Sequence, residues 1–201
     1  MNIFKNTNVV SDDPPILCVD GIYTPLEEEL IKQELTFLYS KLKNAKETGA
    51  ADDGSDVLKT NKRGRWLDDF YQDRESSDIL TLNRKVTKVF QSKKGDSWIW
   101  DNPTTDYITD STLISYYGDG AVYDVHNDAS FVTAITWFHF EEINFNGGDL
   151  VFPQLNIKIE YENNRTVLFP GIVLHEVTPI SLVNKDKRMG GRFAITQFFH
   201  I

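Results

Sequence analysis

The chain of 201 residues is long enough to bury the core of one domain, and 40% of its residues are hydrophobic. Its formal net charge is -9, which repels nucleic-acid phosphates and anionic membranes, so we expect neither as a partner. Cys18 is the single cysteine. This excludes an internal disulfide and a Cys-rich zinc site, and it favours a reducing, cytoplasmic compartment.

The first 110 residues predict helices and loops that support the rest of the chain. A capping box at Thr24 and Glu27 begins an amphipathic helix that runs towards Gly49. The polar stretch 49–64 predicts an exposed loop, and a second helix is expected from Ser77 to about Lys93.

Two short segments in this part have alternative interpretations. The basic cluster Lys62–Trp66 is expected to be solvated, although a mobile lid could bring Arg65 and Trp66 to a substrate. Trp98–Trp100 alternates like a strand, and we expect it to pack on the fold.

Beyond about Ser111 the pattern changes to short β-branched and aromatic runs separated by turn residues. Asn163-Asn164 predicts a tight hairpin between two of these runs. We expect one domain, 1–201, with 1–110 as support and 111–201 as a β-sandwich or barrel. The predicted strands are 112–117, 122–126, 131–140, 149–152, 156–162, 165–169, 173–177 and 192–200.

His126 and Asp128 are two positions apart, so on a strand their side chains point to the same face. His175 lies in another apolar strand, where a histidine needs either a hydrogen-bond partner or a metal. Two histidines and one carboxylate match the facial triad that binds iron(II) and leaves coordination positions open. Zinc accepts the same donor set.

Arg192 begins a strongly apolar strand in which Ala194 and Thr196 share its face. If this face is the interior, the guanidinium requires an anion, and its planar fork suits a carboxylate. Lys185 and Arg188 are rivals, but they lie in a polar segment with two glycines that predicts a loop.

From about Thr112 onwards, these features together resemble the double-stranded β-helix, or jelly roll, of the 2-oxoglutarate-dependent oxygenases, in particular the prolyl 4-hydroxylase-like branch. The matching pieces occur in family order. They are Tyr117-x-x-Gly120-x-x-Tyr123-x-x-His126-x-Asp128, then Gly147-Gly148-Asp149-Leu150-Val151-Phe152-Pro153, then His175-Glu176-Val177, and finally Arg192-Phe193-Ala194-Ile195-Thr196.

The resemblance implies that His126, Asp128 and His175 bind Fe(II). It also implies that Tyr117 and Arg192, assisted by Thr196, hold the distal carboxylate of 2-oxoglutarate. Dioxygen is then the co-substrate, succinate and carbon dioxide are products, and ascorbate is a candidate stimulant. Because Asp128 is present, hydroxylation rather than halogenation is expected. In those hydroxylases the basic residue follows the distal histidine more closely, at a spacing that fits Lys185 better.

The sequence leaves three interpretations of the function open, two of which differ only in the substrate. The first is a protein or peptide residue such as proline, with Tyr123 as a candidate contact. The second is a free amino acid or another small metabolite. The third is a non-catalytic jelly-roll binding domain. His139 is expected to be a paired core or outward-facing histidine rather than a ligand, and His200 is expected to be structural or solvated.

Overall fold

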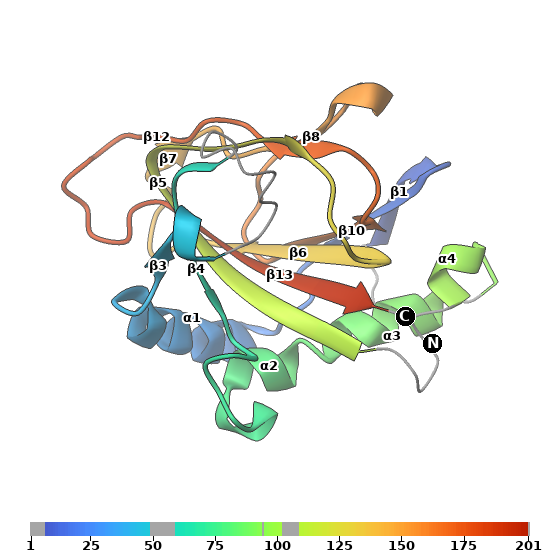
Figure 1. Cartoon of the computed structure of the whole chain (residues 1–201), viewed down its shortest axis with the longest axis horizontal. Coiled ribbons are helices and arrows are strands. Elements are labelled where there is room, and N and C mark those ends of the chain that lie inside the picture. The colour runs from blue at the N-terminus through green and yellow to red at the C-terminus, as the bar shows by residue number, and fades with distance from the viewer. Residues whose placement is uncertain (1–6, 49–58, 94, 102–108, 201) are drawn as a thin grey trace.

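A computed structural model describes residues 7–48, 59–93, 95–101 and 109–200 (Figure 1). An 11-stranded antiparallel sheet runs in the order β1-β2-β10-β6-β13-β5-β11-β8-β9, with β4 on β5 and β3 on β4. β12 pairs with β7 in a second, small sheet. The strands are β1 Thr7–Asp12, β2 Pro15–Asp20, β3 Lys43–Asn44, β4 Lys59–Trp66, β5 Thr109–His126, β6 Val132–Phe138, β7 Phe145–Asn146, β8 Leu150–Phe152, β9 Ile157–Ile159, β10 Arg165–Pro170, β11 His175–Val177, β12 Ser181–Leu182 and β13 Arg192–His200.

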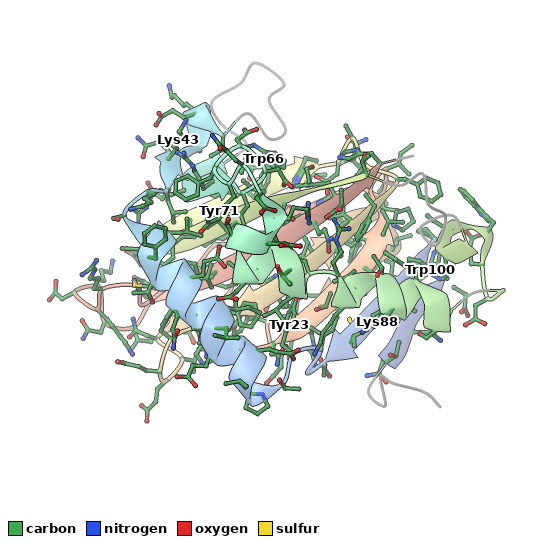
Figure 2. All side chains as sticks on the ribbon, turned by 90° about the horizontal axis from the view of Figure 1, so that it is seen from below. Tyr23, Lys43, Trp66, Tyr71, Lys88 and Trp100 are labelled. Carbon is green, nitrogen blue, oxygen red and sulfur yellow. The ribbon has the colours of Figure 1, made fainter. Side chains whose placement is uncertain are left out.

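Helices cover one face of this curled sheet, as the view from below shows (Figure 2). None of the described helices is long and apolar enough to cross a membrane. The mainly β fold with supporting helices is confirmed, and it is the double-stranded β-helix expected. The helices are α1 Pro25–Tyr39, α2 Asp78–Leu82, α3 Lys85–Ser92 and α4 Trp98–Asp101, with 3-10 turns at Ala45–Glu47, Arg74–Ser76 and Pro153–Leu155.

The start of α1 is the predicted capping box. The Thr24 hydroxyl accepts from the Glu27 N–H at 3.4 Å, and the Glu27 carboxylate accepts from the Thr24 N–H at 2.7 Å. The predicted length of this helix is wrong: it was expected to run towards Gly49, but α1 ends at Tyr39. The chain then turns into β3, which pairs with β4.

The second predicted helix is in fact two. Ser77 caps α2, as expected, but the helix is interrupted at Asn83 and Arg84 before α3 begins. The Asn83 carboxamide accepts from the Tyr23 hydroxyl at 2.9 Å and donates to the Thr112 hydroxyl at 3.4 Å. These long-range hydrogen bonds fix the helix break against the sheet.

Three other predictions of local structure are corrected. Residues 112–117 and 122–126 belong to one strand, β5. Trp98–Trp100 is helical, in α4. Asn163-Asn164 does form a turn, yet it makes no hairpin, because β9 pairs with β8 whereas β10 pairs with β2 and β6.

The first 110 residues, which were predicted to form helices and loops, also contribute strands to the large sheet. β1 and β2 extend the sheet beyond β10, and β4 pairs with β5 along most of its length. Of the predicted exposed loop 49–64, residues 49–58 lie outside the described part of the chain, and the remainder is in β4.

The alternation predicted along β13 divides its side chains between two cores. Phe193 and Ile195 face the helices and pack with α1 and α3. Ala194 faces the interior of the barrel, in a core shared with Tyr117 and Trp137. Arg192 and Thr196 lie on the face of Ala194, so the predicted inward direction of Arg192 is confirmed.

Candidate metal centre and co-substrate pocket

His126, Asp128 and His175 come together at the end of β5. His126 is the last residue of this strand, and His175 opposes it as the first residue of β11. Asp128 follows two positions after His126. One donor atom from each of the three residues lies within 4.8 Å of the others, which is the kind of cluster that can hold one metal ion.

Backbone carbonyls orient both imidazoles. Nδ1 of His126 lies 2.7 Å from the Asp124 carbonyl oxygen, and Nδ1 of His175 lies 2.9 Å from that of Val173. A carbonyl only accepts, so each Nδ1 carries a proton, and Nε2 is the nitrogen that carries the lone pair in the neutral form of each ring. Both Nε2 atoms face the carboxylate of Asp128. The distance from Nε2 to the nearer carboxylate oxygen is 3.8 Å for His126 and 3.5 Å for His175.

The electrostatics also suit a metal ligand. Burial lowers the pKa of His175, against the opposing attraction of Asp128. The imidazole is therefore neutral near neutral pH, which is the state that binds a metal. Two imidazoles and one carboxylate fit iron(II), whose facial triads use this donor set.

Asp128 is held by its surroundings. Its carboxylate accepts a hydrogen bond from the Thr133 hydroxyl at 2.7 Å, and its backbone N–H donates to the Gly171 carbonyl at 2.8 Å. Gly171 is needed at this point, since a Cβ there would lie 2.2 Å from the Ser130 carbonyl oxygen. The turns after β5 and β10 thus approach each other closely at Gly171, and the backbone hydrogen bond between them helps to position Asp128.

A small cavity opens beside the three residues. Asp128 is the one carboxylate among the described residues that line it. The lining combines the three candidate metal ligands with aromatic and aliphatic side chains and one lysine: Lys62, Leu113, Tyr117, Tyr123, His126, Asp128, Ile135, His175, Val177, Thr196 and Phe198.

Arg192 lies behind Tyr117 and is 1% exposed. Its guanidinium carbon is 4.4 Å from the centre of the Tyr117 ring and 5.4 Å from that of Trp137. One terminal nitrogen donates to the Gly148 carbonyl, while Nε has no hydrogen-bond partner. Among the described residues no carboxylate forms an ion pair with this buried charge, so the residues present fit the carboxylate of a bound acid.

Tyr117 connects Arg192 with the cavity. Burial raises the pKa of Tyr117 to about 12, although Arg192 opposes this shift. The phenol therefore remains protonated and can donate a hydrogen bond to a carboxylate. Thr196 also lines the cavity, but it stands four residues along β13, roughly 13 Å from Arg192 by strand rise. Its contact with the same carboxylate stays a prediction.

The rival cations lie elsewhere. Lys185 is exposed and pairs with Asp119 at 2.7 Å. Arg188 is exposed and stacks on Tyr39. His139 bonds to the Tyr161 hydroxyl at 2.6 Å, and His200 contacts Ser111 at 3.3 Å, so both have the structural partners that were expected.

Lys62 is the site residue that the sequence did not reveal. We expected a solvated loop cation, yet Lys62 is in β4, is 4% exposed and lines the cavity. Its ammonium nitrogen lies 4.3 Å from the centre of the Tyr123 ring and 5.6 Å from that of Tyr117. The only available signal was that Lys62, Gly64 and Trp66 occupy alternate positions, as on one face of a strand. In a segment this polar, such a pattern is hard to distinguish from an exposed loop.

The three proposed substrate contacts are placed differently. Tyr123 lines the cavity, and its ring stacks on His126 with centroids 3.6 Å apart. Trp66 packs on Phe198, and its indole N–H donates to the Thr48 carbonyl at 2.7 Å. Arg65 stacks on Phe70 and does not line the cavity. Since Arg65 and Trp66 belong to β4, the interpretation as a mobile loop is wrong for them.

Comparison with known proteins agrees with this geometry. Residues 112–200, which contain all three metal-binding candidates and Arg192, match the family model of the 2OG-Fe(II) oxygenase superfamily. This part of the chain therefore resembles a 2OG-Fe(II) oxygenase domain. Such oxygenases use Fe(II), 2-oxoglutarate and O2, and the His126, Asp128 and His175 cluster could bind the iron. No curated protein matches the chain in sequence.

Solved structures share the fold of this chain over nearly its whole length. A Pseudomonas putida prolyl-4-hydroxylase has a TM-score of 0.65 at 14% identity, covering 92% of each chain. The viral collagen prolyl hydroxylase of Paramecium Bursaria Chlorella virus-1, in complex with 2OG, has a TM-score of 0.59 at 16% identity, covering 92% of this chain and 96% of that one. A 2OG-Fe(II) oxygenase family oxidoreductase from Burkholderia pseudomallei has a TM-score of 0.58 at 13% identity, covering 92% and 85%.

Proposed function

We propose that this oxygenase hydroxylates an amino acid residue, with proline in a peptide or protein as the first candidate. The observation that carries the proposal is the convergence, in one cavity, of two oriented imidazoles and a carboxylate beside a buried arginine without an ion-pair partner among the described residues. The prolyl hydroxylases with the same fold support the choice of residue.

His126, Asp128 and His175 would hold the iron from one side. Their donors need little rearrangement, because Asp124 and Val173 orient the imidazoles and Thr133 orients the carboxylate. Three protein ligands leave the opposite positions open for co-substrate and dioxygen. When bound, iron and 2-oxoglutarate supply the oxidising chemistry, in which decarboxylation to succinate accompanies activation of dioxygen.

Arg192 would bind the distal carboxylate of 2-oxoglutarate, and Tyr117 would donate a hydrogen bond to it. Thr196 would add a hydroxyl from the same face of β13. The surrounding apolar side chains, such as Ile135 and Phe198, exclude water from the reacting groups. Asp128 would supply the carboxylate ligand to the iron, which favours hydroxylation.

An anaerobic titration tests the metal assignment. The purified protein should bind iron(II) and 2-oxoglutarate together and give a weak visible charge-transfer band. Asp128→Ala should lose the band and the release of succinate, because it removes one of three ligands.

Asp124→Ala is the matched control. It removes a carboxylate from the same strand, two positions before His126, but keeps the backbone carbonyl that orients this imidazole. The control should keep the band. If Asp128→Ala retained both the band and full turnover, the assignment of the metal site would be wrong.

A further inference from the structure

Five cationic side chains gather around the face of β4 that is turned away from the cavity. Two of them share one aromatic ring, since the guanidinium carbons of Arg63 and Arg188 lie 4.5 and 5.8 Å from the centre of the Tyr39 ring. Tyr39 is the last residue of α1, so this helix, β4 and the loop before β13 meet here. We call these five side chains the basic patch: Lys41, Lys43, Arg63, Arg65 and Arg188.

The other three members join the patch through a second aromatic group and through β3. Arg65 lies over the Phe70 ring at 4.7 Å, and the centroids of the Phe70 and Phe37 rings are 6.4 Å apart. The Lys41 ammonium lies 4.3 Å from the centre of the Phe37 ring. Lys43, on β3, pairs with β4 between its two arginines. These arginines are two positions apart and share a face, so β4 joins both aromatic groups.

The charges of the patch are not neutralised within the described part of the protein. None of the five side chains forms an ion pair or a hydrogen bond with a residue in the ranges that the structure describes. Glu47, the first carboxylate after β3, accepts from the Asn44 N–H instead. Exposed cations elsewhere do pair, as Lys158 does with Asp149 at 3.2 Å. The patch is therefore a local excess of positive charge on a chain of net charge -9.

The geometry of the patch suits carboxylates. A guanidinium that stacks on a ring keeps its N–H edge free, and this edge binds a carboxylate through two parallel hydrogen bonds. Phe37 is 53% exposed and offers an apolar contact beside the charges. A long polyanion such as nucleic acid would also meet the acidic remainder of the surface, whereas a short acidic peptide segment contacts the patch alone. Charge complementarity thus favours an acidic polypeptide.

We propose that the basic patch binds an acidic segment of the polypeptide substrate, apart from the residue that is hydroxylated. This rests on the proposed function and names a class of substrate for it. Lys62 lines the cavity, and Trp66 packs on Phe198, which also lines it. Both alternate with the arginines of β4, so patch and cavity lie on opposite faces of one strand. The patch would therefore strengthen substrate binding without touching the reacting groups.

Direct binding tests the proposal without turnover. The full chain is titrated into a fluorescein-labelled peptide of alternating glutamate and serine, with fluorescence anisotropy as the readout. A matched peptide has glutamine in place of glutamate, and a single-stranded oligothymidylate of equal length represents nucleic acid. The glutamate peptide should bind saturably at low salt, and the other two probes should bind at least tenfold more weakly.

Arg65→Gln combined with Arg188→Gln tests whether the patch is responsible. The double variant should weaken binding of the glutamate peptide at least fivefold. It should leave the charge-transfer band given by iron(II) and 2-oxoglutarate unchanged, because neither side chain lines the cavity. Lys158→Gln combined with Lys185→Gln is the matched control. It removes the same charge from exposed side chains that already have ion pairs, and peptide affinity should stay within about twofold.

Kinetics connect the patch with the substrate. A peptide of prolyl-glycine repeats is compared with the same peptide extended by the glutamate and serine segment, and release of succinate is followed. The acidic extension should lower KM at least fivefold and leave kcat unchanged, because it adds binding remote from the reacting residue. The Arg65 and Arg188 double variant should abolish this advantage.

Four results would overturn the inference. Equal binding of the glutamate and glutamine peptides, or tighter binding of the oligothymidylate, would exclude a site for acidic peptides. An equal loss in both double variants would reduce the effect to net charge, and equal KM values for the two proline peptides would separate the patch from the substrate. Failure of the proposed function is distinguishable, since neither proline peptide would then be turned over, whereas the anisotropy titrations would still report on the patch.

Discussion

At the scale of single residues, the site depends on side chains that are charged or polar and yet buried. Arg192 is the clearest case, since its guanidinium is enclosed by Tyr117 and Trp137 and its Nε has no partner. Burial lowers the pKa of Arg192, although Tyr117 opposes this. In the proposed site, this buried cation would gain its ion pair when 2-oxoglutarate binds.

Replacement of Arg192 should therefore separate co-substrate binding from metal binding. A charge-assisted contact to a partly buried carboxylate contributes about 1.5–3 kcal/mol, or roughly one to two decades in affinity. Arg192→Ala should weaken 2-oxoglutarate binding at least tenfold and leave iron binding nearly intact. Titrations of each ligand, with calorimetric detection, measure both effects.

Lys185→Ala and Arg188→Ala are the controls for this prediction. Both remove exposed cations, and such contacts contribute at most about 1 kcal/mol. Each should leave 2-oxoglutarate affinity little changed. A large loss with Lys185→Ala and a small one with Arg192→Ala would transfer the co-substrate role to the loop before β13.

At the scale of elements, the candidate metal centre lies where two turns meet. The turn after β5 carries Asp128, and the turn after β10 contributes Gly171, whose carbonyl accepts from the Asp128 N–H. The contact is backbone to backbone, which leaves no room for a side chain at Gly171. The position of the carboxylate is therefore coupled to the packing of two elements that are distant in sequence.

A single methyl group at this point should affect both stability and metal binding. In Gly171→Ala the new Cβ would meet the Ser130 carbonyl oxygen, so one turn must move. Overpacking of this kind costs about 1–3 kcal/mol, which lowers Tm by several degrees. Because Asp128 moves with its turn, iron affinity should fall by about tenfold.

Gly118→Ala provides the comparison, since a Cβ there would meet the Tyr116 ring at an ordinary contact distance of 3.4 Å. Thermal unfolding and iron titration of the two variants decide the question. Equal stability and equal iron affinity would show that the contact between the turns does not position Asp128.

At the scale of the whole molecule, two cores lie on the two faces of one curled sheet. The helices close the outer face, and the inner face surrounds the site (Figures 1 and 2). Two histidines, the buried His175 and the half-buried His139, have lowered pKa values. Burial lowers the pKa of His175 and that of His139, where Lys32 acts in the same direction and Glu28 opposes.

The metal-free protein should therefore lose stability in mild acid. The unfolded chain takes up protons at histidine near pH 6.5, whereas the folded protein does so only at lower pH. Protons then favour the unfolded state, and the free energy of unfolding falls as pH drops through this window. Tm should be higher at about pH 7.5 than at about pH 5.5, and His139→Gln should reduce the difference. If the difference in Tm between the two pH values were unchanged in His139→Gln, His139 would not contribute to the loss of stability in acid.

Local patterns in the sequence determined much of this protein. The motif His126-Asn127-Asp128, the buried strand around His175 and the alternation along Arg192–Thr196 depend on spacing and on strand geometry, which are properties of short segments. The capping box at Thr24 and Glu27 is local in the same sense. For these features the structure agrees with the prediction. Each one depends only on interactions within a few residues or on the two-residue period of a single strand.

Tertiary structure alone decided the rest. Lys62 joins the site only because β4 pairs with β5 beside Tyr117, a contact between segments about fifty residues apart. The break between α2 and α3 depends on hydrogen bonds from Asn83 to distant partners, and Asn163-Asn164 cannot form a hairpin because the flanking strands belong to other pairs. Neither strand pairing nor the burial of a polar segment is encoded in the composition of that segment. Both follow from which surfaces meet when the sheet closes.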